Sequence, residues 1–289
     1  MVTVFTPTYN RAYILPELYR SLCNQSCQNF EWLIVDDGSS DNTSQIVDEF
    51  LKEGKITIRY FQQSNGGKHR AINKGLKEAK GDWFFIVDSD DRLTPDAIEW
   101  IINQGDDIKD NPNFAGLSGI RIYPDGRKIG GGNDFGTIDS NAIEIRLKYM
   151  VAGDLAEVFK TEILRQYPFP EFEGERFCPE ALVWNRIAHK YNLRFIHKGI
   201  YICEYLGDGL TANIIKVRRN SPRASMTYYS ELFNNPLPLL QKIKAAINFW
   251  RFAQISKIKG FKMYHPLSLI CIGIGNLYRL NDSMSINKN

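Results

Sequence analysis

Cysteines are few in this sequence, and their spacing does not predict a metal site. Five occur among 289 residues, and Cys23 and Cys27 lack the second Cys or His pair that a zinc site requires. The odd number, in a chain that starts directly with a strand-like segment at residues 2–6, predicts a reducing cytoplasm and no targeting segment. No apolar run is as long as a membrane span, so a spanning helix is not predicted.

Acidic residues are absent from one long stretch of the chain. Residues 232–281 contain no Asp or Glu but seven basic residues, whereas the remainder has 29 basic and 33 acidic residues. Such an asymmetry predicts a surface with a specific partner. With 43% hydrophobic and 24% charged residues, the chain otherwise has the composition of a globular protein with one large domain or two modest ones. The seven basic residues are Lys242, Lys244, Arg251, Lys257, Lys259, Lys262 and Arg279.

The first half of the chain alternates between short apolar segments and amphipathic ones. Strands are expected at residues 2–6, 30–35, 56–61 and 83–87, and helices at 13–27, after residue 41 and at 68–80. This alternation predicts βαβ units, and hence an α/β fold with a Rossmann-like, mainly parallel sheet flanked by helices. The second half lacks this rhythm, and a helix is expected there at residues 141–150.

Polar residues follow four of the expected strands. They are Thr6–Arg11, Asp36–Asp37, Gly66–Lys68 and Asp88–Asp91. The carboxyl ends of parallel strands meet at one edge of a sheet, where ligands bind in α/β folds. We therefore expect these residues to line a nucleotide site.

The segment Asp88–Asp91 places three carboxylates at the end of a strongly apolar strand. Asp88 and Asp90 are two residues apart, so on an extended chain they face the same side. Their hard oxygens suit Mg²⁺ or Mn²⁺, which proteins hold with one or two carboxylates together with a substrate phosphate. The alternative is that these aspartates cap the next helix, although residues 94–96 already provide a helix start.

Each of the other strand-end segments also has a purely structural interpretation. Tyr9 can be an aromatic residue at the edge of the core, and Asp36 or Asp37 can form an Asx-turn. Gly66–Lys68 can be a simple turn with a solvated lysine. It is not a Walker A loop, because the second spaced glycine and the hydroxyl residue after the lysine are missing.

The order and spacing of four segments resemble the successive motifs of glycosyltransferase family 2 enzymes of the bacterial type, which build polysaccharides and other glycans on a GT-A fold. The segments are Thr6–Arg11, Val35–Asp41, Asn65–Gly67 and Asp88–Asp91, and the resemblance extends over roughly the first hundred residues. It implies that Pro7 and Tyr9 lie against the base of a nucleotide-sugar and that Asp37 accepts a hydrogen bond from this base. It further implies that Asp88 meets the ribose and that Asp90 is the metal ligand of an Asp-x-Asp motif. The other candidate donor-binding residues at these strand ends are Thr6, Arg11, Gly66, Lys68 and Ser89.

Two further segments supply candidate residues. Pro179 suits the first position of a helix and leaves Glu180 in its first turn. Family 2 enzymes commonly have a Glu-Asp pair here that provides the catalytic base; this chain has one carboxylate, so the resemblance implies Glu180 as the base. The alternative is that Glu180 only stabilises the helix N-terminus. Arg218 and Arg219 are expected in a loop that folds over the donor diphosphate, or in an ordinary solvated loop.

These features together predict an inverting, metal-dependent glycosyltransferase, either a hexosyl- or an N-acetylhexosaminyl-transferase. Its expected donor is a UDP-sugar, its cofactor Mn²⁺ or Mg²⁺, and its acceptor a glycan or lipid-linked glycan. One alternative is a nucleotidyltransferase acting on sugar phosphates, which would need a Gly-rich, basic loop in place of Thr6–Arg11. The other is a non-catalytic nucleotide- or membrane-binding module, against which Asp90 and Glu180 argue. A nucleic-acid partner is not expected.

The predicted organisation has three parts. Residues 1–110 form the nucleotide-sugar-binding half of a catalytic domain, residues 111–231 its acceptor-binding half, and residues 232–289 a basic, aromatic-rich helical tail. A tail helix is expected at residues 236–261, with a seam along one side. Basic residues beside apolar and aromatic ones suit anionic lipid headgroups, so residues 236–280 are expected to bring a cytoplasmic protein to the cytoplasmic membrane face. The alternative is that these helices pack on the catalytic domain. The seam consists of Leu240, Ile243, Ile247 and Trp250.

Overall fold

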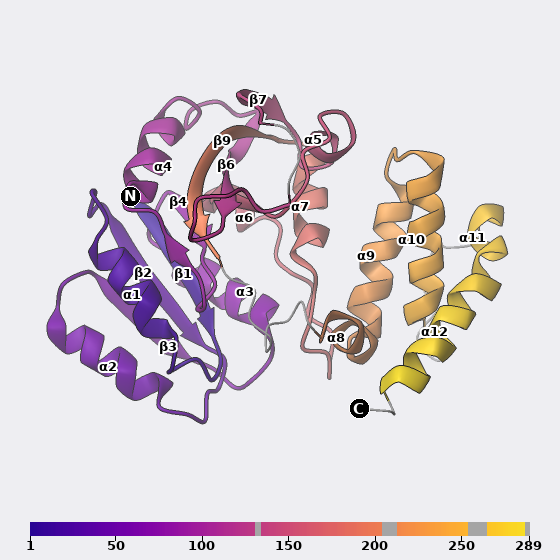
Figure 1. Cartoon of the computed structure of the whole chain (residues 1–289), viewed down its shortest axis with the longest axis horizontal. Coiled ribbons are helices and arrows are strands. Elements are labelled where there is room, and N and C mark those ends of the chain that lie inside the picture. Colours follow the sequence, from indigo (N-terminus) through magenta and orange to yellow (C-terminus); the bar gives the residue numbers. More distant parts are fainter. Residues whose placement is uncertain (131–133, 204–212, 254–264, 287–289) are drawn as a thin grey trace. The chain divides into compact units, whose positions relative to one another are not determined.

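The computed structural model describes residues 1–130, 134–203, 213–253 and 265–286 (Figure 1). The chain divides into two compact units. The first contains Met1–Pro168 and Arg186–Tyr205, and the second contains Phe169–Asn185 and Leu206–Asn289. The predicted halves 1–110 and 111–231 and the predicted tail 232–289 are functional divisions, and they stay predictions.

The first unit is built on a mixed sheet. Its strands are β1 (Val2–Thr8), β2 (Phe30–Asp36), β3 (Ile58–Gln62), β4 (Trp83–Ile86), β5 (Arg92–Leu93), β6 (Phe114–Ile122), β7 (Thr137–Ser140), β8 (Leu155–Lys160) and β9 (Asn192–Ile202). Their order is β3-β2-β1-β4-β8-β6-β9-β5, with β7 paired to β9. The strands β1 to β4 pair in parallel, and β8 runs antiparallel to its neighbours β4 and β6. The predicted α/β fold with a mainly parallel central sheet is therefore confirmed.

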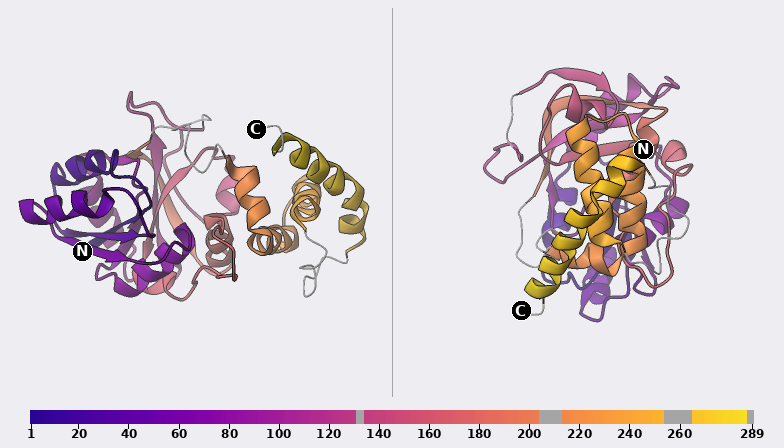
Figure 2. Two further views of the ribbon diagram at one scale, coloured as in Figure 1. Left: turned by 90° about the horizontal axis from the view of Figure 1, so that it is seen from below. Right: turned by 90° about the vertical axis from the view of Figure 1, so that its right-hand side faces the viewer.

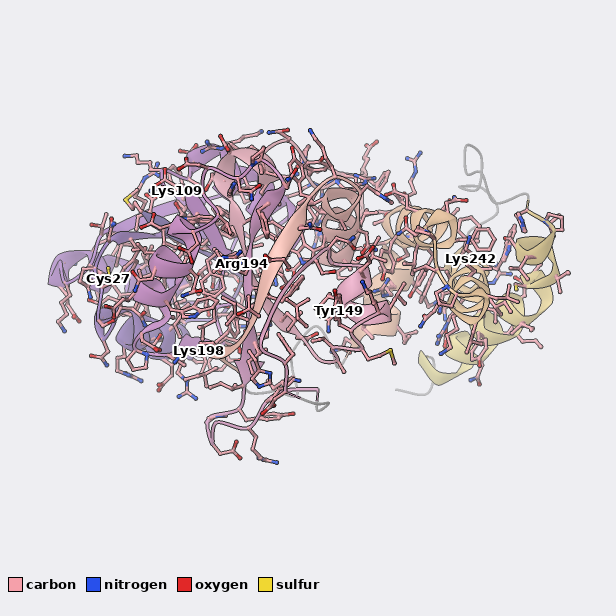
Figure 3. All side chains as sticks on the ribbon, turned by 90° about the horizontal axis from the view of Figure 1, so that it is seen from above. Cys27, Lys109, Tyr149, Arg194, Lys198 and Lys242 are labelled. Atoms are coloured by element: carbon pink, nitrogen blue, oxygen red, sulfur yellow. The ribbon has the colours of Figure 1, made fainter. Side chains whose placement is uncertain are left out.

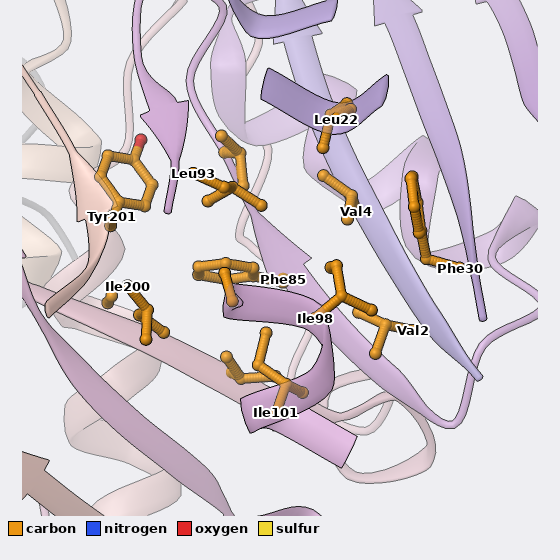
Figure 4. Packing of buried hydrophobic residues seen from close by; sticks show 14 of the residues in the cluster. Val2, Val4, Leu22, Phe30, Phe85, Leu93, Ile98, Ile101, Ile200 and Tyr201 are labelled. Carbon is orange, nitrogen blue, oxygen red and sulfur yellow. The ribbon is translucent and has the colours of Figure 1, made fainter. Parts of the chain in front are cut away.

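Helices cover both faces of the parallel part of this sheet. The helices of the unit are α1 (Leu15–Cys23), α2 (Thr43–Glu53), α3 (Lys68–Glu78), α4 (Ala97–Asp106), α5 (Glu144–Leu147) and α6 (Thr161–Leu164). The apolar sides of α1, α2 and α4 pack with Val4 and Phe85 on one face (Figure 4). On the opposite face lies α3, where an added Cβ at Gly75 would be 2.2 Å from the Phe5 ring. Because both faces are covered, β1 and β2 are buried along their whole length.

Polar side chains connect β7 to β9 and determine where α5 begins. Arg194 of β9 donates hydrogen bonds to both carboxylate oxygens of Asp139 in β7, at 2.9 and 3.0 Å (Figure 3). The helix expected at residues 141–150 is shorter, because Asn141 Oδ1 accepts hydrogen bonds from two following amides and begins α5 at Glu144. Arg146, within α5, donates hydrogen bonds to the carbonyls of Val151 and Gly153 in the segment that follows the helix.

The second unit is helical. It contains α8 (Ile214–Asn220), α9 (Pro222–Asn234), α10 (Leu239–Phe252), α11 (Pro266–Ile270) and α12 (Ile272–Ile286), and α7 (Glu180–Ala188) begins in it. Helix α10 packs against α9, α11 and α12 (Figures 1 and 2). The close approach of α10 and α12 depends on Gly275, where an added Cβ would lie 2.5 Å from Trp250 Cβ. Among the residues that the structure describes, no helix is both long and apolar enough to cross a membrane.

The seam predicted along the tail helix faces the inside of this unit. Ile243, Ile247 and Trp250 pack against the core of α9 to α12, and Trp250 Nε1 donates a hydrogen bond of 2.8 Å to the Ser268 carbonyl. Of this seam, Leu240 is 63% exposed. Helix α10 ends at Phe252, and residues 254–261 of the expected helix lie outside the described part of the chain. The seam turns inward because its large apolar side chains lose water contact against neighbouring helices.

Candidate active site

Two of the predicted residues at the end of β1 are buried. Thr6 is fully buried, and its Oγ1 accepts a hydrogen bond of 2.9 Å from Trp32 Nε1. Pro7 is buried as well. Tyr9, in contrast, is 48% exposed, so its ring is accessible to a ligand. The side chain of Thr6 therefore stabilises the sheet, and Tyr9 is the residue of this segment that can stack on a base.

Asp37, predicted to bind the base, holds the turn that begins α3. Its carboxylate accepts hydrogen bonds from the amides of Gly66 and Gly67, at 2.8 and 2.7 Å, and from Gln63 Nε2 at 2.7 Å. Gly67 has a φ of 96°, which side-chain-bearing residues rarely adopt and which explains the glycine at this position. A carboxylate offers about four acceptor positions, so these bonds leave Asp37 room for a further donor.

Lys68, the first residue of α3, forms an ion pair with Asp88, which follows β4. Their Nζ and Oδ1 atoms are 2.5 Å apart, and the side chains are 25% and 26% exposed. Burial by itself would raise the pKa of Asp88, but the positive charges of Lys68, Arg121 and Arg11 outweigh it and lower that pKa below its ordinary value. Asp88 is therefore ionised, and the pair ties the start of α3 to the end of β4.

The negative charge of Asp90 is less well stabilised than that of Asp88. Arg11 Nη2 lies 3.9 Å from Asp90 Oδ2, yet burial and the charge of Asp88 raise the pKa of Asp90 above its ordinary value. Ser89, between the two aspartates, is buried. A divalent cation would relieve this repulsion, so the carboxylates fit one. In the described residues no group of three or more His, Cys, Asp or Glu side chains is placed to hold a metal.

Two residues at this site come from strands without a recognisable motif. The hydroxyl of Tyr201, in β9, donates a hydrogen bond of 2.6 Å to Asp91 Oδ2 and accepts one of 3.0 Å from the Asp88 amide. The guanidinium carbon of Arg121, in β6, lies 4.3 Å from the centre of the Tyr201 ring. Burial and the charge of Asp88 raise the pKa of Asp91 to about 7, and the hydrogen bond from Tyr201 opposes this rise. A single sequence contains no local signal for either residue, because strand pairing alone brings them to the site.

The remaining predicted residues belong to the second unit. Glu180 is the first residue of α7 and is partly buried. Arg218 and Arg219 lie in α8, so the prediction of a loop is wrong. Within α8, the Arg218 guanidinium lies against three aromatic rings, and such contacts attract a cation. The rings are those of Phe177, Tyr228 and Tyr229, with centres 5.6, 5.4 and 5.3 Å from the guanidinium carbon.

Comparison with known proteins identifies related sequences. Residues 3–134 match the family model described as Glycosyl transferase family 2. Glycosyltransferase GlyG of Streptococcus pneumoniae is 36% identical over 104 residues, which are 36% of this chain and 35% of GlyG. The GalNAc(5)-diNAcBac-PP-undecaprenol beta-1,3-glucosyltransferase of Campylobacter jejuni is 28% identical over 206 residues, which are 70% of this chain and 63% of that enzyme. The match therefore spans about a third of GlyG and just under two thirds of the Campylobacter enzyme.

Solved structures share the fold over nearly the whole chain. TarS 1–349 of S. aureus in complex with UDP-GlcNAc has a TM-score of 0.64 at 19% identity, covering 100% of this chain and 92% of TarS 1–349. The mannosyltransferase PcManGT of Pyrobaculum calidifontis, in complex with GDP-Man and Mn²⁺, has a TM-score of 0.56 at 16% identity, covering 97% of this chain and 87% of PcManGT. At these identities the likeness concerns the fold, and it agrees with the predicted GT-A architecture.

Proposed function

We propose that this chain, which belongs to glycosyl transferase family 2, transfers a sugar from a nucleotide-diphosphate sugar to a hydroxyl group of a glycan or lipid-linked glycan. The observation that carries the proposal is the pairing of Asp88 with Lys68 and of Asp90 with Arg11 at the carboxyl edge of a parallel sheet. A UDP-sugar is supported by TarS, which was solved with UDP-GlcNAc, and a lipid-linked acceptor by the name of the Campylobacter relative.

The donor is proposed to lie across the ends of β1, β2 and β4. The accessible ring of Tyr9 offers an apolar face to the base, and Asp37 has room for one more hydrogen bond. The diphosphate is an anion, and the cations Arg11 and Lys68 would bind it in a site where partial burial strengthens the attraction. Asp88, kept ionised, would accept a hydrogen bond from the ribose. Thr6, Pro7, Gly66 and Ser89 would shape the walls of this site.

Asp90 is proposed to hold Mn²⁺ or Mg²⁺, beside the Asp88 carboxylate. Such an ion, when bound, supplies positive charge to the leaving diphosphate. Lys68 and Arg11 already stand beside these carboxylates, so they place two further positive charges where the charge of the leaving group develops. The chain's own residues thereby contribute to stabilising the leaving group.

Glu180 is proposed as the base. It would take the proton from the acceptor hydroxyl while that oxygen attacks the anomeric carbon of the sugar. In the same displacement the bond to the diphosphate breaks, the diphosphate leaves with the bonding electrons, and the configuration inverts. The position of Glu180 in the first turn of α7 supports the proposal, because its side chain is not fully buried there. Arg218 and Arg219 stay candidates for diphosphate binding, although the aromatic contacts of Arg218 favour a structural role.

Turnover of a panel of donors tests this function. The full chain is incubated with UDP-sugars and GDP-sugars in the presence of Mn²⁺, with water and simple glycosides as acceptors, and nucleoside diphosphate release is measured. Release that depends on one sugar nucleotide supports the proposal. Formation of pyrophosphate from a nucleoside triphosphate and a sugar phosphate would identify a nucleotidyltransferase. Binding of nucleotides without turnover of any donor would instead identify a binding module.

We also propose that the second unit contacts an anionic membrane, through a face other than the predicted seam. Ile270, Ile274 and Leu277 follow one side of α11 and α12 and are 76%, 46% and 68% exposed. Residues 232–281 have no acidic side chain, and Lys242 and Lys244 lie on α10 (Figure 3). An apolar helix face in a purely basic segment matches the headgroup region of anionic lipids.

Vesicle sedimentation tests this contact. The full chain should sediment with phosphatidylserine-containing vesicles and much less with phosphatidylcholine vesicles. Serine at Ile270, Ile274 and Leu277 together should reduce binding, whereas Leu240→Ser, at the exposed residue of the α10 seam, should not. Equal binding of the triple variant and the parent, or no binding by the parent, would refute the membrane contact and leave the proposed transfer reaction unaffected.

A further inference from the structure

A buried tyrosine ties together the two ends of the proposed metal-binding turn. Tyr201 is fully buried, and its hydroxyl oxygen has partners at both ends of Asp88–Asp91. It accepts a hydrogen bond of 3.0 Å from the Asp88 amide and donates one of 2.6 Å to Asp91 Oδ2. Within the turn, the Asp91 amide donates to the Asp88 carbonyl at 3.1 Å. The turn is therefore closed on itself and fixed to a side chain from a distant strand.

The Tyr201 ring is held from several sides, so its hydroxyl has a fixed position. Phe85 meets the ring edge-on with centroids 6.0 Å apart, and Arg121 lies over the ring with its guanidinium carbon 4.3 Å from the centre. Leu93 is the partner of Tyr201 in the pairing of β5 with β9 (Figure 4). Because β5 follows the turn directly, this pairing sets the distance between the turn and the tyrosine.

We propose that Tyr201 is a positioning residue for donor binding. Its hydroxyl holds Asp91 and the Asp88 backbone, and the direction of the Asp88 and Asp90 carboxylates follows from the shape of the turn between them. In this assignment Tyr201 touches neither the donor nor a metal ion and acts only through the turn. The proposal rests on the proposed function, since it concerns the same donor site.

Removal of the Tyr201 hydroxyl takes one hydrogen bond from the Asp91 carboxylate and one from the Asp88 amide. Asp91 is 7% exposed, so its carboxylate loses a hydrogen bond where water replaces it poorly. The Asp88 amide loses its acceptor at the same time. The turn would shift until both groups are satisfied, and Asp88 and Asp90 would move with it. Tyr201→Phe should therefore weaken donor binding by up to about 100-fold, because the preference of the turn for its present shape can fall by no more than the strength of the lost hydrogen bonds.

The chain offers a matched control in Tyr19→Phe. Tyr19 is also buried, at 4% exposure, and its hydroxyl donates a hydrogen bond of 3.0 Å to the Glu53 carboxylate, away from the strand-end residues. Both variants lose one buried hydroxyl that is bonded to a carboxylate, so both should melt at a lower temperature than the parent. Only Tyr201→Phe should lose affinity for UDP in the presence of Mn²⁺, measured by calorimetry on folded protein. Its KM for the donor should rise more than its KM for the acceptor.

A double-mutant cycle with Asp91→Ala shows whether Tyr201 acts through Asp91. In that background, Tyr201→Phe should lower UDP affinity clearly less than it does in the parent, because only the bond from the Asp88 amide to the hydroxyl is left to lose. Equal UDP affinity of Tyr201→Phe and Tyr19→Phe, or a full additional loss in the Asp91→Ala background, would overturn the positioning role while the parent's transfer activity stands. A parent that binds no nucleotide and releases none from any donor would refute the proposed function and this role together.

Discussion

Two pairs of contacts, one in each unit, use charged side chains in different ways. In the first unit, Asp88 and Lys68 pair across the ends of β4 and α3, and each keeps about a quarter of its side chain exposed. In the second, Glu175 is 2% exposed, and its carboxylate accepts the amides of Arg223 and Ala224 at the start of α9, at 2.9 and 3.0 Å. Charges that pair with each other at the surface can exchange partners for a ligand, whereas a buried carboxylate on a helix start is committed to the fold.

The arginines repeat this contrast. Arg11 lies near Asp90 and donates a hydrogen bond of 2.6 Å to the exposed Tyr13 hydroxyl. Arg218 packs against aromatic rings, and these contacts favour a structural role. Both residues are arginines, so residue type does not separate them. A candidate donor-binding residue is supported when its contacts within the protein leave its charged group accessible to a ligand.

Glu180→Gln should have the largest effect and tests whether the second unit also carries a reactive carboxylate. The amide keeps the shape of the side chain but cannot accept a proton. We expect kcat to fall by about 10²- to 10⁴-fold with nearly unchanged donor affinity. Transfer rates and calorimetric donor binding measure the two quantities separately. Parental turnover in this variant would place the base elsewhere.

Asp90→Asn tests whether the paired charges of the first unit bind a ligand. Loss of one of two carboxylates should weaken Mn²⁺-dependent UDP binding by about 10- to 100-fold, because a neutral amide is a poorer partner for a cation. Calorimetry with Mn²⁺ and with EDTA gives the metal-dependent part. The control is Asp82→Asn, at an 80% exposed side chain that pairs with the N-terminus. An Asp90→Asn variant that responds to Mn²⁺ like the control would show that Asp90 is not a ligand.

Glu175→Gln tests whether the buried Glu175 carboxylate stabilises the start of α9. The amide can accept only with its oxygen, so one of the two helix-start amides loses its partner. We expect the free energy of unfolding to fall by about 1–3 kcal/mol, the cost of an unsatisfied buried group, without loss of UDP affinity in folded protein. Denaturant unfolding measures the change, with Glu173→Gln at an exposed position as the control. A stability equal to that of the control would mean that the cap contributes little.

Asp41→Asn should have the smallest effect, and it depends on pH. Burial would raise the pKa of Asp41, but hydrogen bonds from the Thr43 hydroxyl and from the amides of Ala12 and Thr43 outweigh it and lower that pKa. A pKa that is lower in the folded state means stabilisation that is present above the unfolded value of about 4 and lost as pH falls through the folded value. The variant should be less stable than the parent by about 1 kcal/mol at neutral pH.

Unfolding of both proteins at neutral pH and near pH 3 measures this dependence. The difference between parent and variant should shrink at the lower pH, where Asp41 takes up a proton. A difference of the same size at both values would mean that the geometry of the hydrogen bonds, and not the charge, provides the stabilisation.

Much of the first unit follows from local patterns. The alternation of strands and helices over the first hundred or so residues predicted the segments that form β1 to β4, because the two-residue and 3.6-residue periods are visible in short windows. Parallel pairing then placed Tyr9, Asp37, Lys68 and Asp88 at the same edge. The tail was harder to predict, because an apolar seam has the same spacing whether it faces lipid or neighbouring helices. In the structure, Ile243, Ile247 and Trp250 of α10 face the neighbouring helices.

The sequence by itself determined which segments form the parallel sheet and which polar residues follow its strands, because turns, glycines and hydrophobic periods act over a few residues. Only the tertiary structure decided which other groups hold those polar residues in place. Asp37 holds the Gly66–Gly67 turn, and Asp91 is bonded to Tyr201, 110 residues further along the chain. Such contacts depend on strand order and on burial, and both are set by the packing of the whole sheet.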